Sequence, residues 1–174
     1  EHAPERVFSG VLPHVDTGVT KEELEAVFAD LEHVPEGFTV HPKLAKQFEG
    51  RHKMFVEDGE VDWALGEAFA YGTLLHEGTS VRVSGEDSRR GTFSHRHAAL
   101  IDYDNGSVYI PLADTVRNDA RFWIYDSLLS EFAVLGFEYG YSVVNKDALV
   151  VWEAQFGDFM NGAQVIIDNF LVAA

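Results

Sequence analysis

The sequence has 174 residues, of which 46% are hydrophobic, and this is enough for one domain with a buried core. Thirteen Lys and Arg against 29 Asp and Glu give a formal net charge of −16, which argues against nucleic acid and anionic membrane surfaces as partners. The absence of Cys excludes disulfides, thiolate metal sites and a cysteine nucleophile. No apolar run approaches the roughly 20 residues of a membrane span, and the start has neither a Met nor a signal-peptide pattern. We therefore expect a soluble, intracellular chain or a piece of a longer one.

The first part of the chain, residues 1–60, predicts a helical lead-in. Thr20 begins a capping-box pattern in front of apolar residues at helical spacing, and a second helical pattern follows Pro42. Asp62 is the expected N-cap of a third helix, which is the most regular of the three. This third helix opens the second part of the chain, residues 61–174.

From residue 80 onward, strand patterns alternate with helical patterns. Asn105-Gly106 is a strong signal for the turn of a β-hairpin. The expected elements are strands over 81–83, 122–125 and 148–152, hairpin arms over 97–103 and 107–112, and helices over 130–141 and 161–172. Strand and helix in alternation imply a parallel sheet with right-handed crossovers. The predicted fold class is α/β, a mainly parallel sheet flanked by helices, with a helical N-terminal lead-in and one β-hairpin.

Three segments follow the carboxyl ends of predicted strands, where ligands bind in open α/β sheets. The first segment, 85–97, holds two acids, three Arg and two His, and it is either a salt-bridged surface loop or a ligand-binding loop. If it is a strand, His95 and His97 project from the same face, as metal ligands would. No third ligand is fixed by the spacing, so we predict no metal site in the chain.

The second segment, 130–142, predicts a helix that is apolar nearly all round and is therefore expected to be buried. Its two acids, Glu131 and Glu138, are seven residues apart and therefore lie on the same face of the helix. This face is either the solvent face or a functional face. Glu131 lies in the first turn, where the helix dipole favours a carboxylate. Apolar neighbours would favour the protonated form of Glu131 and keep a proton available for acid–base chemistry.

The third segment, 152–164, carries two aromatic residues three positions apart, Phe156 and Phe159. Such a pair after a strand is either part of the core or an aromatic wall for a flat heterocycle. In the second case, Gln155 is the polar group that would orient the heterocycle.

Together, the runs 85–97, 130–142 and 152–164 resemble the central, pyrimidine-binding domain of the thiamine-diphosphate-dependent first component of the 2-oxoglutarate dehydrogenase complex. The resemblance extends from about His41 to the end of the sequence. Looser similarity extends to transketolase and to the second subunit of pyruvate dehydrogenase. The resemblance implies oxidative decarboxylation of 2-oxoglutarate in the tricarboxylic acid cycle, with the cofactor as electron sink and a lipoyl carrier as acyl acceptor.

The resemblance also implies roles for individual residues. In that family, the residue that matches Glu131 hydrogen-bonds a ring nitrogen of the aminopyrimidine and promotes the tautomer whose imino nitrogen takes the thiazolium proton. The other cofactor-binding positions match Glu86, Leu129, Gln155, Phe156 and Phe159. Phe159 is the stronger candidate for direct contact with the ring, and Asp87 is a weaker candidate than Glu86. His95 and His97 are expected to be structural or to contact another subunit.

The sequence departs from a complete thiamine-diphosphate site. Gly157-Asp158 is followed by Phe159, so the Gly-Asp-Gly motif that marks the magnesium and diphosphate domain is missing, as are the substrate-binding histidines of the family. The resemblance therefore implies a partial catalytic unit that is inactive alone, with Mg²⁺ held by another domain. It also implies a homodimer, a lipoyl-bearing succinyltransferase as partner component, and a location in the bacterial cytoplasm or the mitochondrial matrix.

Two other functions remain open at this point. The chain could belong to another thiamine-diphosphate enzyme, of the pyruvate dehydrogenase or transketolase type, or it could be a non-catalytic acidic assembly module. Both enzyme hypotheses predict an exposed apolar patch on the helix 130–141, because that surface would lie at an interface between subunits.

Overall fold

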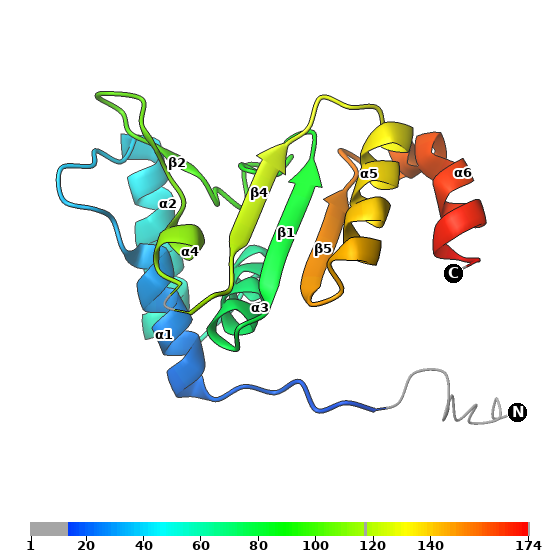
Figure 1. Ribbon diagram of the computed structural model, residues 1–174. Helices are drawn as coiled ribbons and strands as arrows, with labels where there is room; N and C mark the ends of the chain where they lie inside the picture. Colours follow the sequence, from blue (N-terminus) through cyan, green and yellow to red (C-terminus); the bar gives the residue numbers. More distant parts are fainter. Residues whose placement is uncertain (1–13, 117, 174) are drawn as a thin grey trace, which may run out of the picture.

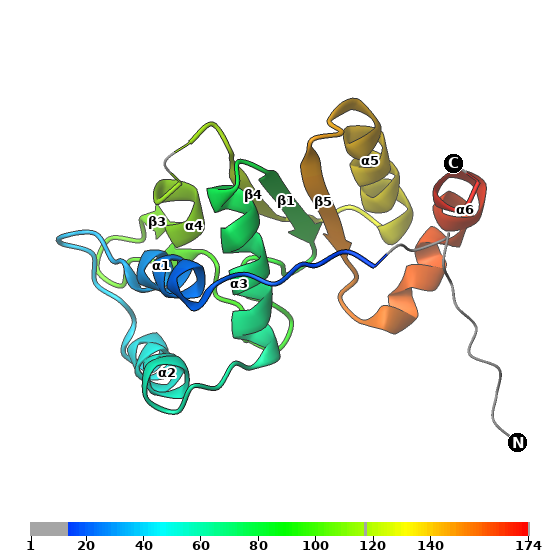
Figure 2. The ribbon, with the colours of Figure 1, turned by 90° about the horizontal axis from the view of Figure 1, so that it is seen from below.

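A three-stranded parallel sheet forms the centre of the computed structural model, which describes residues 14–116 and 118–173. The strands are β1 (Ser80–Gly85), β4 (Phe122–Asp126) and β5 (Ala148–Glu153), in the order β4-β1-β5 (Figure 1). Helices cover both faces of the sheet, with α3 (Trp63–His76) on one face and α5 (Glu131–Val144) on the other (Figure 2). The predicted α/β class and the parallel arrangement of the strands are confirmed.

The side chains of β1 alternate between these two helical layers. Val81 and Val83 are fully buried in the main core with α3, whereas Arg82 and Ser84 hydrogen-bond to Glu138 on α5. This alternation follows from the two-residue period of a strand. The central strand therefore joins an apolar layer to a layer that contains a buried ion pair.

The predicted helices of the lead-in are present as α1 (Lys21–Glu32) and α2 (Pro42–His52), and a π-helical turn, Lys53–Glu57, extends α2. Thr20 closes the predicted capping box of α1, and the side chain of Asp62 accepts a hydrogen bond from the backbone N–H of Leu65 at the start of α3. Among the described residues, no helix has the length and apolar character needed to cross a bilayer.

One hydrophobic core joins the lead-in to the sheet. Its buried members from α1, α3, β1 and β4 include Val27, Phe28, Leu65, Phe69, Leu75, Val81, Val83, Phe122 and Ile124. The contact between α1 and α3 is close at Gly72, where a Cβ atom would lie only 2.2 Å from the Cγ1 atom of Val27. Figure 2 shows α1 lying against α3 on the side away from the sheet.

The hairpin is shorter than the sequence predicts. The strands are only β2 (Leu100–Ile101) and β3 (Val108–Tyr109), so the predicted arms 97–103 and 107–112 are wrong in length. One reason is Pro111, which has no N–H to donate and instead begins a helical turn, α4 (Pro111–Asp114). The other is Asp102, whose carboxylate accepts backbone N–H bonds within the connecting turn.

The predicted last helix, 161–172, begins earlier and is irregular. A 3₁₀ segment, Gly157–Ala163, leads into a short α6 (Gln164–Ile166) and a π-helical end, Ile167–Leu171. Glycines within the 3₁₀ segment lower its α-helical propensity.

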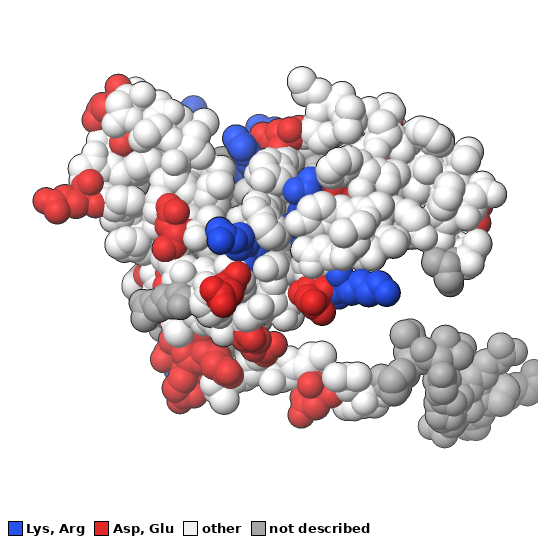
Figure 3. All heavy atoms as spheres, in the orientation of Figure 1, with Lys and Arg blue, Asp and Glu red and all other residues white. Residues whose placement is uncertain are grey.

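The sequence predicts that the helix α5 is buried because it is apolar nearly all round, and this prediction is wrong. Val134, Leu135 and Glu138 are buried, whereas Phe132 and Phe137 are 49% and 56% exposed. The exposed apolar patch expected for an enzyme subunit is therefore present on this helix. Figure 3 shows that the surface over α5 and α6 carries few charged atoms, while acidic atoms gather over α1.

Candidate functional site

The carboxyl ends of the three strands lie side by side. Gly85, the last residue of β1, is in register with Asp126 of β4 and with Glu153 of β5. The three segments that the sequence singles out therefore leave the sheet from the same edge, which is the upper edge in Figure 1. Such an edge is the usual position of a ligand site in an open α/β sheet.

Glu131 is the first residue of α5, and Ser130 is its N-cap. The side chain of Glu131 is half-buried and lies against Gly162 of the 3₁₀ segment, where a Cβ atom would approach the Oε2 atom of Glu131 to 3.3 Å. A side chain at position 162 would therefore crowd the carboxylate. The glycine lets the backbone of the third segment approach the one carboxyl group at the start of α5.

Phe156 and Phe159 belong to the same third segment as Gly162 and are only partly covered. Their rings are 5.9 Å apart and edge-to-face, and Phe93 from the first segment is 6.0 Å from Phe156. Phe156 and Phe159 are 48% and 47% exposed, so the interpretation of this pair as core residues is wrong. Three aromatic rings from two segments instead form an open apolar wall.

The remaining predicted site residues lie on the same edge. Gln155 is half-buried, and its backbone carbonyl accepts a hydrogen bond of 3.1 Å from the Thr92 hydroxyl, which ties the third segment to the first. Leu129 is 56% exposed and lies two residues before α5, and Glu86 is exposed directly after β1. Within the described part of the chain, the carboxylate of Glu86 has no hydrogen-bond partner.

Arg96 holds this edge together, and the sequence did not single it out. Its buried guanidinium donates to both carboxylate oxygens of Glu153 at 2.8 and 2.9 Å, to Glu67 of α3 at 2.5 and 3.0 Å, and to the carbonyl of Ser88 at 2.8 Å. Burial disfavours the charged form, but the hydrogen bonds that Arg96 donates to Glu153 and Glu67 outweigh it and raise the pKa of Arg96. The first segment is thus salt-bridged, but it is not an ordinary surface loop.

A second buried ion pair connects the sheet to α5. The Nε and Nη2 atoms of Arg82 donate to Glu138 at 2.7 and 2.9 Å, and the Ser84 hydroxyl donates to Glu138 at 2.8 Å. Glu138 is only 3% exposed, so the solvent-face interpretation of the helix face that it shares with Glu131 is wrong. The guanidinium of Arg82 also lies 4.6 Å from the ring centre of Tyr141 and 4.9 Å from that of Tyr125. In the sequence, the only signal of this pair is Arg82, a charged residue within the predicted strand 81–83.

His95 and His97 do not form a ligand pair of a strand. Their segment is a loop in which Ser94 and His97 have positive φ angles of 54° and 48°, so the premise of a shared strand face is wrong. The ring of His95 packs against Gly91, where a Cβ atom would lie 2.4 Å from its Cε1 atom. Burial, together with the charges of Arg51 and Arg90, lowers the pKa of His97. In the described ranges, no three metal-ligating side chains converge.

A known protein family covers the three segments that form this edge. Residues 59–174 match the family model described as transketolase, pyrimidine binding domain. The chain belongs to this family. The matched residues include all three segments at the carboxyl edge of the sheet, and the match begins just before α3.

The relatives of this pyrimidine-binding domain include several 2-oxoglutarate dehydrogenases. The chain is 50% identical over 155 residues to the 2-oxoglutarate dehydrogenase E1 component of Rickettsia conorii, covering 89% of this chain and 17% of that protein. It is 50% identical over 170 residues to the mitochondrial 2-oxoglutarate dehydrogenase of Saccharomyces cerevisiae, covering 97% and 17%. A multifunctional 2-oxoglutarate metabolism enzyme of a Mycobacterium species is 55% identical over 144 residues, covering 79% and 11%. The chain thus spans about one sixth or less of the length of these relatives.

Proposed function

We propose that this chain is the pyrimidine-binding part of a thiamine-diphosphate-dependent 2-oxoglutarate dehydrogenase, which decarboxylates 2-oxoglutarate oxidatively in the tricarboxylic acid cycle. The observation that carries this proposal is the position of Glu131 at the start of α5, against Gly162 of the segment that also carries the exposed rings of Phe156 and Phe159, in a chain of the pyrimidine-binding family. The names of the relatives support 2-oxoglutarate as the substrate.

The residues present fit the pyrimidine end of thiamine diphosphate. A flat heterocycle with a ring nitrogen needs a hydrogen-bonding group at its edge and apolar surfaces on its faces. Glu131 would supply the first, and Phe156 and Phe159 would supply part of the second. When bound, thiamine diphosphate supplies the electron sink that decarboxylation of a 2-oxo acid requires.

In this proposal, the residues of this chain bind and orient the pyrimidine ring and exchange a proton with it. The carboxyl group of Glu131 would hold or release a proton toward the ring nitrogen. The first turn of α5 would fix the position of this carboxyl group. The exposed phenylalanines Phe156 and Phe159 would exclude water from the ring, which strengthens the hydrogen bond to Glu131. The Arg82–Glu138 pair would fix the axis of α5 against β1 and so keep the carboxylate in place.

Other parts of the catalytic unit would come from outside this chain. The net charge of −16 gives a diphosphate little support, so we propose that Mg²⁺ and the diphosphate are held by another domain. The exposed apolar face of α5 suits a second copy of the protein, which would complete the site in a homodimer. A lipoyl-bearing succinyltransferase would accept the acyl group, in the bacterial cytoplasm or the mitochondrial matrix.

The test is the activity of the complete protein with Glu131→Ala or Glu131→Gln. We expect the rate of acceptor reduction with 2-oxoglutarate to fall by about 100-fold or more, the usual scale of a lost acid–base group, while the protein still folds. Glu77→Gln, on the exposed end of α3, is the matched control and should leave the rate unchanged. Normal turnover of the Glu131 variants would contradict the role of Glu131.

The substrate and the enzyme class need separate measurements. Comparing 2-oxoglutarate with pyruvate and with a sugar phosphate in the same assay distinguishes the three kinds of thiamine-diphosphate enzyme. Calorimetric titration of the complete protein with thiamine diphosphate and Mg²⁺ should show binding. An absence of binding would favour a non-catalytic assembly module instead. The 174-residue chain alone should have no decarboxylase activity.

A further inference from the structure

A groove along the second half of α1 has no role in the proposed reaction. It consists of two adjoining hollows of about 570 and 590 Å³, whose linings share Ala29, Asp30 and Thr115. The end of α3, the strand β3 and the end of α4 supply the rest of its walls. Figure 2 shows α4 and β3 next to α1. None of the six residues of the candidate cofactor site lines this groove, so it is a separate feature of the surface.

The chain around the groove is acidic. The two segments that form most of its walls, 21–32 and 109–121, together carry seven Asp and Glu against three Lys and Arg. Asp30 and Asp114 line the groove itself, whereas no Lys or Arg of the described residues does so. Two histidines also line it, and the balance of these segments stays negative even when both histidines are protonated. A ligand of this groove is therefore a cation.

The two acids that line the groove lie where a helix does not favour them. The carboxyl end of a helix carries partial negative charge, so basic residues are preferred in its last turn. The last turn of α1 contains Asp30 and no basic residue, and Asp114 is the last residue of α4. His76 of α3 hydrogen-bonds to Asp30 at 2.7 Å. Among the described residues, nothing donates a hydrogen bond to the carboxylate of Asp114 or forms an ion pair with it.

A buried hydroxyl group without a partner lines the same groove. Tyr109 of β3 is 6% exposed, and its hydroxyl group has no hydrogen-bond partner in the described part of the chain. Such a group is rare in folded proteins and needs an explanation. Burial, and then the charges of Asp114 and Asp30, raise the pKa of Tyr109, so both carboxylates act on this hydroxyl group. A ligand with several N–H donors would bond to all three side chains.

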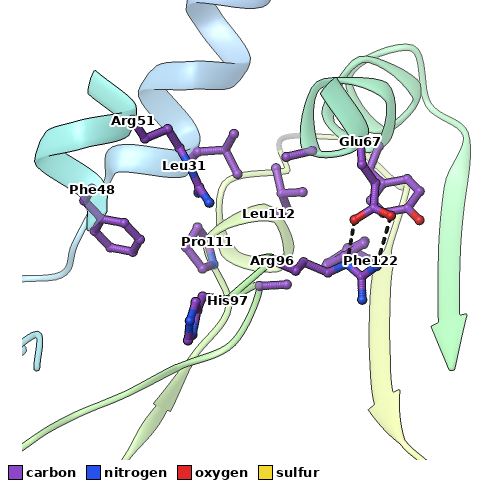
Figure 4. A pocket seen from close by; sticks show the side chains of 12 residues that line it. Leu31, Phe48, Arg51, Glu67, Arg96, His97, Pro111, Leu112 and Phe122 are labelled. Atoms are coloured by element: carbon purple, nitrogen blue, oxygen red, sulfur yellow. Dashed lines mark hydrogen bonds and ion pairs between the residues drawn. The ribbon is translucent and has the colours of Figure 1, made fainter. Parts of the chain in front are cut away.

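The buried arginines near α1 lie on a different side of this helix. Leu31, which follows Asp30, points into the small cavity shown in Figure 4, together with Arg51 and Arg96. Arg96 is bonded to Glu67 there, and neither arginine lines the groove. These arginines therefore do not supply the missing cation.

The shape of the groove and its surroundings favour a guanidinium group on a longer chain. A guanidinium is planar, keeps its charge and carries five N–H donors, whereas an ammonium is a compact ion with three. The groove is open along α1, and Glu22 and Glu25 in the first half of this helix are exposed. Figure 3 shows acidic atoms over α1. A segment with more than one cation uses this whole surface, since complementary charges along an interface favour association.

We propose that this groove binds an arginine-bearing basic segment of another protein. One guanidinium lies between Asp30 and Asp114 and donates to the hydroxyl group of Tyr109. Further cations of the segment lie along the exposed acids of α1. This surface is distinct from the candidate cofactor site, so the segment binds whether or not the cofactor is present.

Calorimetric titration of the complete protein with the peptide acetyl-Gly-Arg-Gly-Arg-Gly-amide tests the proposal. We expect saturable binding of this peptide and no binding of the same peptide with citrulline, an uncharged analogue, in place of arginine. Asp114 is exposed, so Asp114→Asn keeps the fold and should weaken binding of the arginine peptide by about threefold or more. Asp147→Asn makes the same change on the exposed turn before β5 and should leave the affinity unchanged. Equal losses in the two variants would show a general attraction to the acidic chain and would overturn the proposal.

Tyr109→Phe separates recognition from folding. It removes only a hydroxyl group that has no partner among the described residues, so the melting temperature should not fall, whereas the affinity for the arginine peptide should fall by about twofold or more. An unchanged affinity would contradict the position of the guanidinium. Spermidine is the probe for a small polyamine, and tighter binding of spermidine than of the peptide would also overturn the proposal. Thiamine diphosphate binding should be the same in all variants, so this proposal and the proposed function can fail separately.

Discussion

Arg82 and Glu138 form a bidentate ion pair between the central strand β1 and the helix α5, with N–O distances of 2.7 and 2.9 Å. Their side chains are 13% and 3% exposed. Glu138 is two turns from Glu131 on the same side of α5, so the pair fixes the helix that carries the candidate catalytic carboxylate. The hydrogen bond to Glu138 raises the pKa of Arg82 although burial opposes it, which keeps the guanidinium charged.

The first prediction concerns the removal of one partner of this pair. Glu138→Gln leaves Arg82 buried without a carboxylate, and this should cost about 3 kcal/mol or more of local stability. Amide hydrogen exchange of α5 and β1 in the complete protein measures the loss. Arg82→Met combined with Glu138→Leu should recover much of it, because the double variant leaves no unpaired charge. Equal exchange in the wild type and Glu138→Gln would show that the pair does not hold α5.

The second prediction concerns Arg96, which joins α3, the first segment and the end of β5. Arg96→Lys keeps the charge but cannot reach Glu67 and Glu153 together, since a Lys ammonium lacks the planar fork of Arg. We expect faster proteolysis within the loop 86–97 and a melting temperature lower by several degrees. Arg121→Lys is the matched control, because Arg121 is exposed. Unchanged proteolysis of Arg96→Lys would mean that the loop is held by other contacts.

The third prediction concerns the contact between α1 and α3. A Cβ atom at position 72 would lie 2.2 Å from the Cγ1 atom of Val27, which is fully buried, so Gly72→Ala should lower the free energy of unfolding by about 1–3 kcal/mol. Adding Val27→Ala removes the atom in conflict, so the cost of the double variant should be less than the sum of the two single costs. Thermal unfolding of the complete protein measures this coupling, and additive costs would contradict the packing of Val27 against Gly72. Gly50→Ala, on the open side of α2, is the control.

Local signals in the sequence predicted most of the elements. The capping box at Thr20, the N-cap at Asp62 and the Ser130 start of α5 each depend on a few neighbouring residues, and each is present in the structure. The hairpin arms were overestimated because two local features, Pro111 and the carboxylate of Asp102, compete with the strand pattern.

The candidate site, like the fold, could be predicted only in part from the sequence. The three segments could be placed at one edge, because the carboxyl ends of parallel strands meet there. The partners of Arg96 and Arg82 could not be predicted, since Glu67 and Glu138 are 29 and 56 residues away from them in the chain and no spacing rule links them. Which face of α5 is exposed also depends on tertiary packing and not on its nearly uniform apolar pattern.

The last prediction concerns acid stability at the hairpin turn. The buried carboxylate of Asp102 accepts backbone N–H bonds from Thr39 at 3.0 Å, from Asp104 at 2.8 Å and from Asn105 at 3.0 Å, and the bond from Thr39 contributes most to lowering its pKa. Because the pKa is lower in the folded state, this carboxylate stabilises the fold above its unfolded pKa of about 3.9. That contribution is lost as the pH falls through the folded pKa.

Asp102→Asn should therefore make the stability less dependent on pH in the acid range. Between pH 5 and pH 3, the melting temperature of the wild type should fall more steeply than that of the variant, because only the wild type loses the contribution of this carboxylate. Asp147→Asn, on the exposed turn before β5, removes a carboxyl group without such bonds among the described residues and should retain the steep fall of the wild type. If Asp102→Asn and Asp147→Asn show the same pH dependence, the backbone bonds to Asp102 do not link the lead-in to the hairpin in the way the structure indicates.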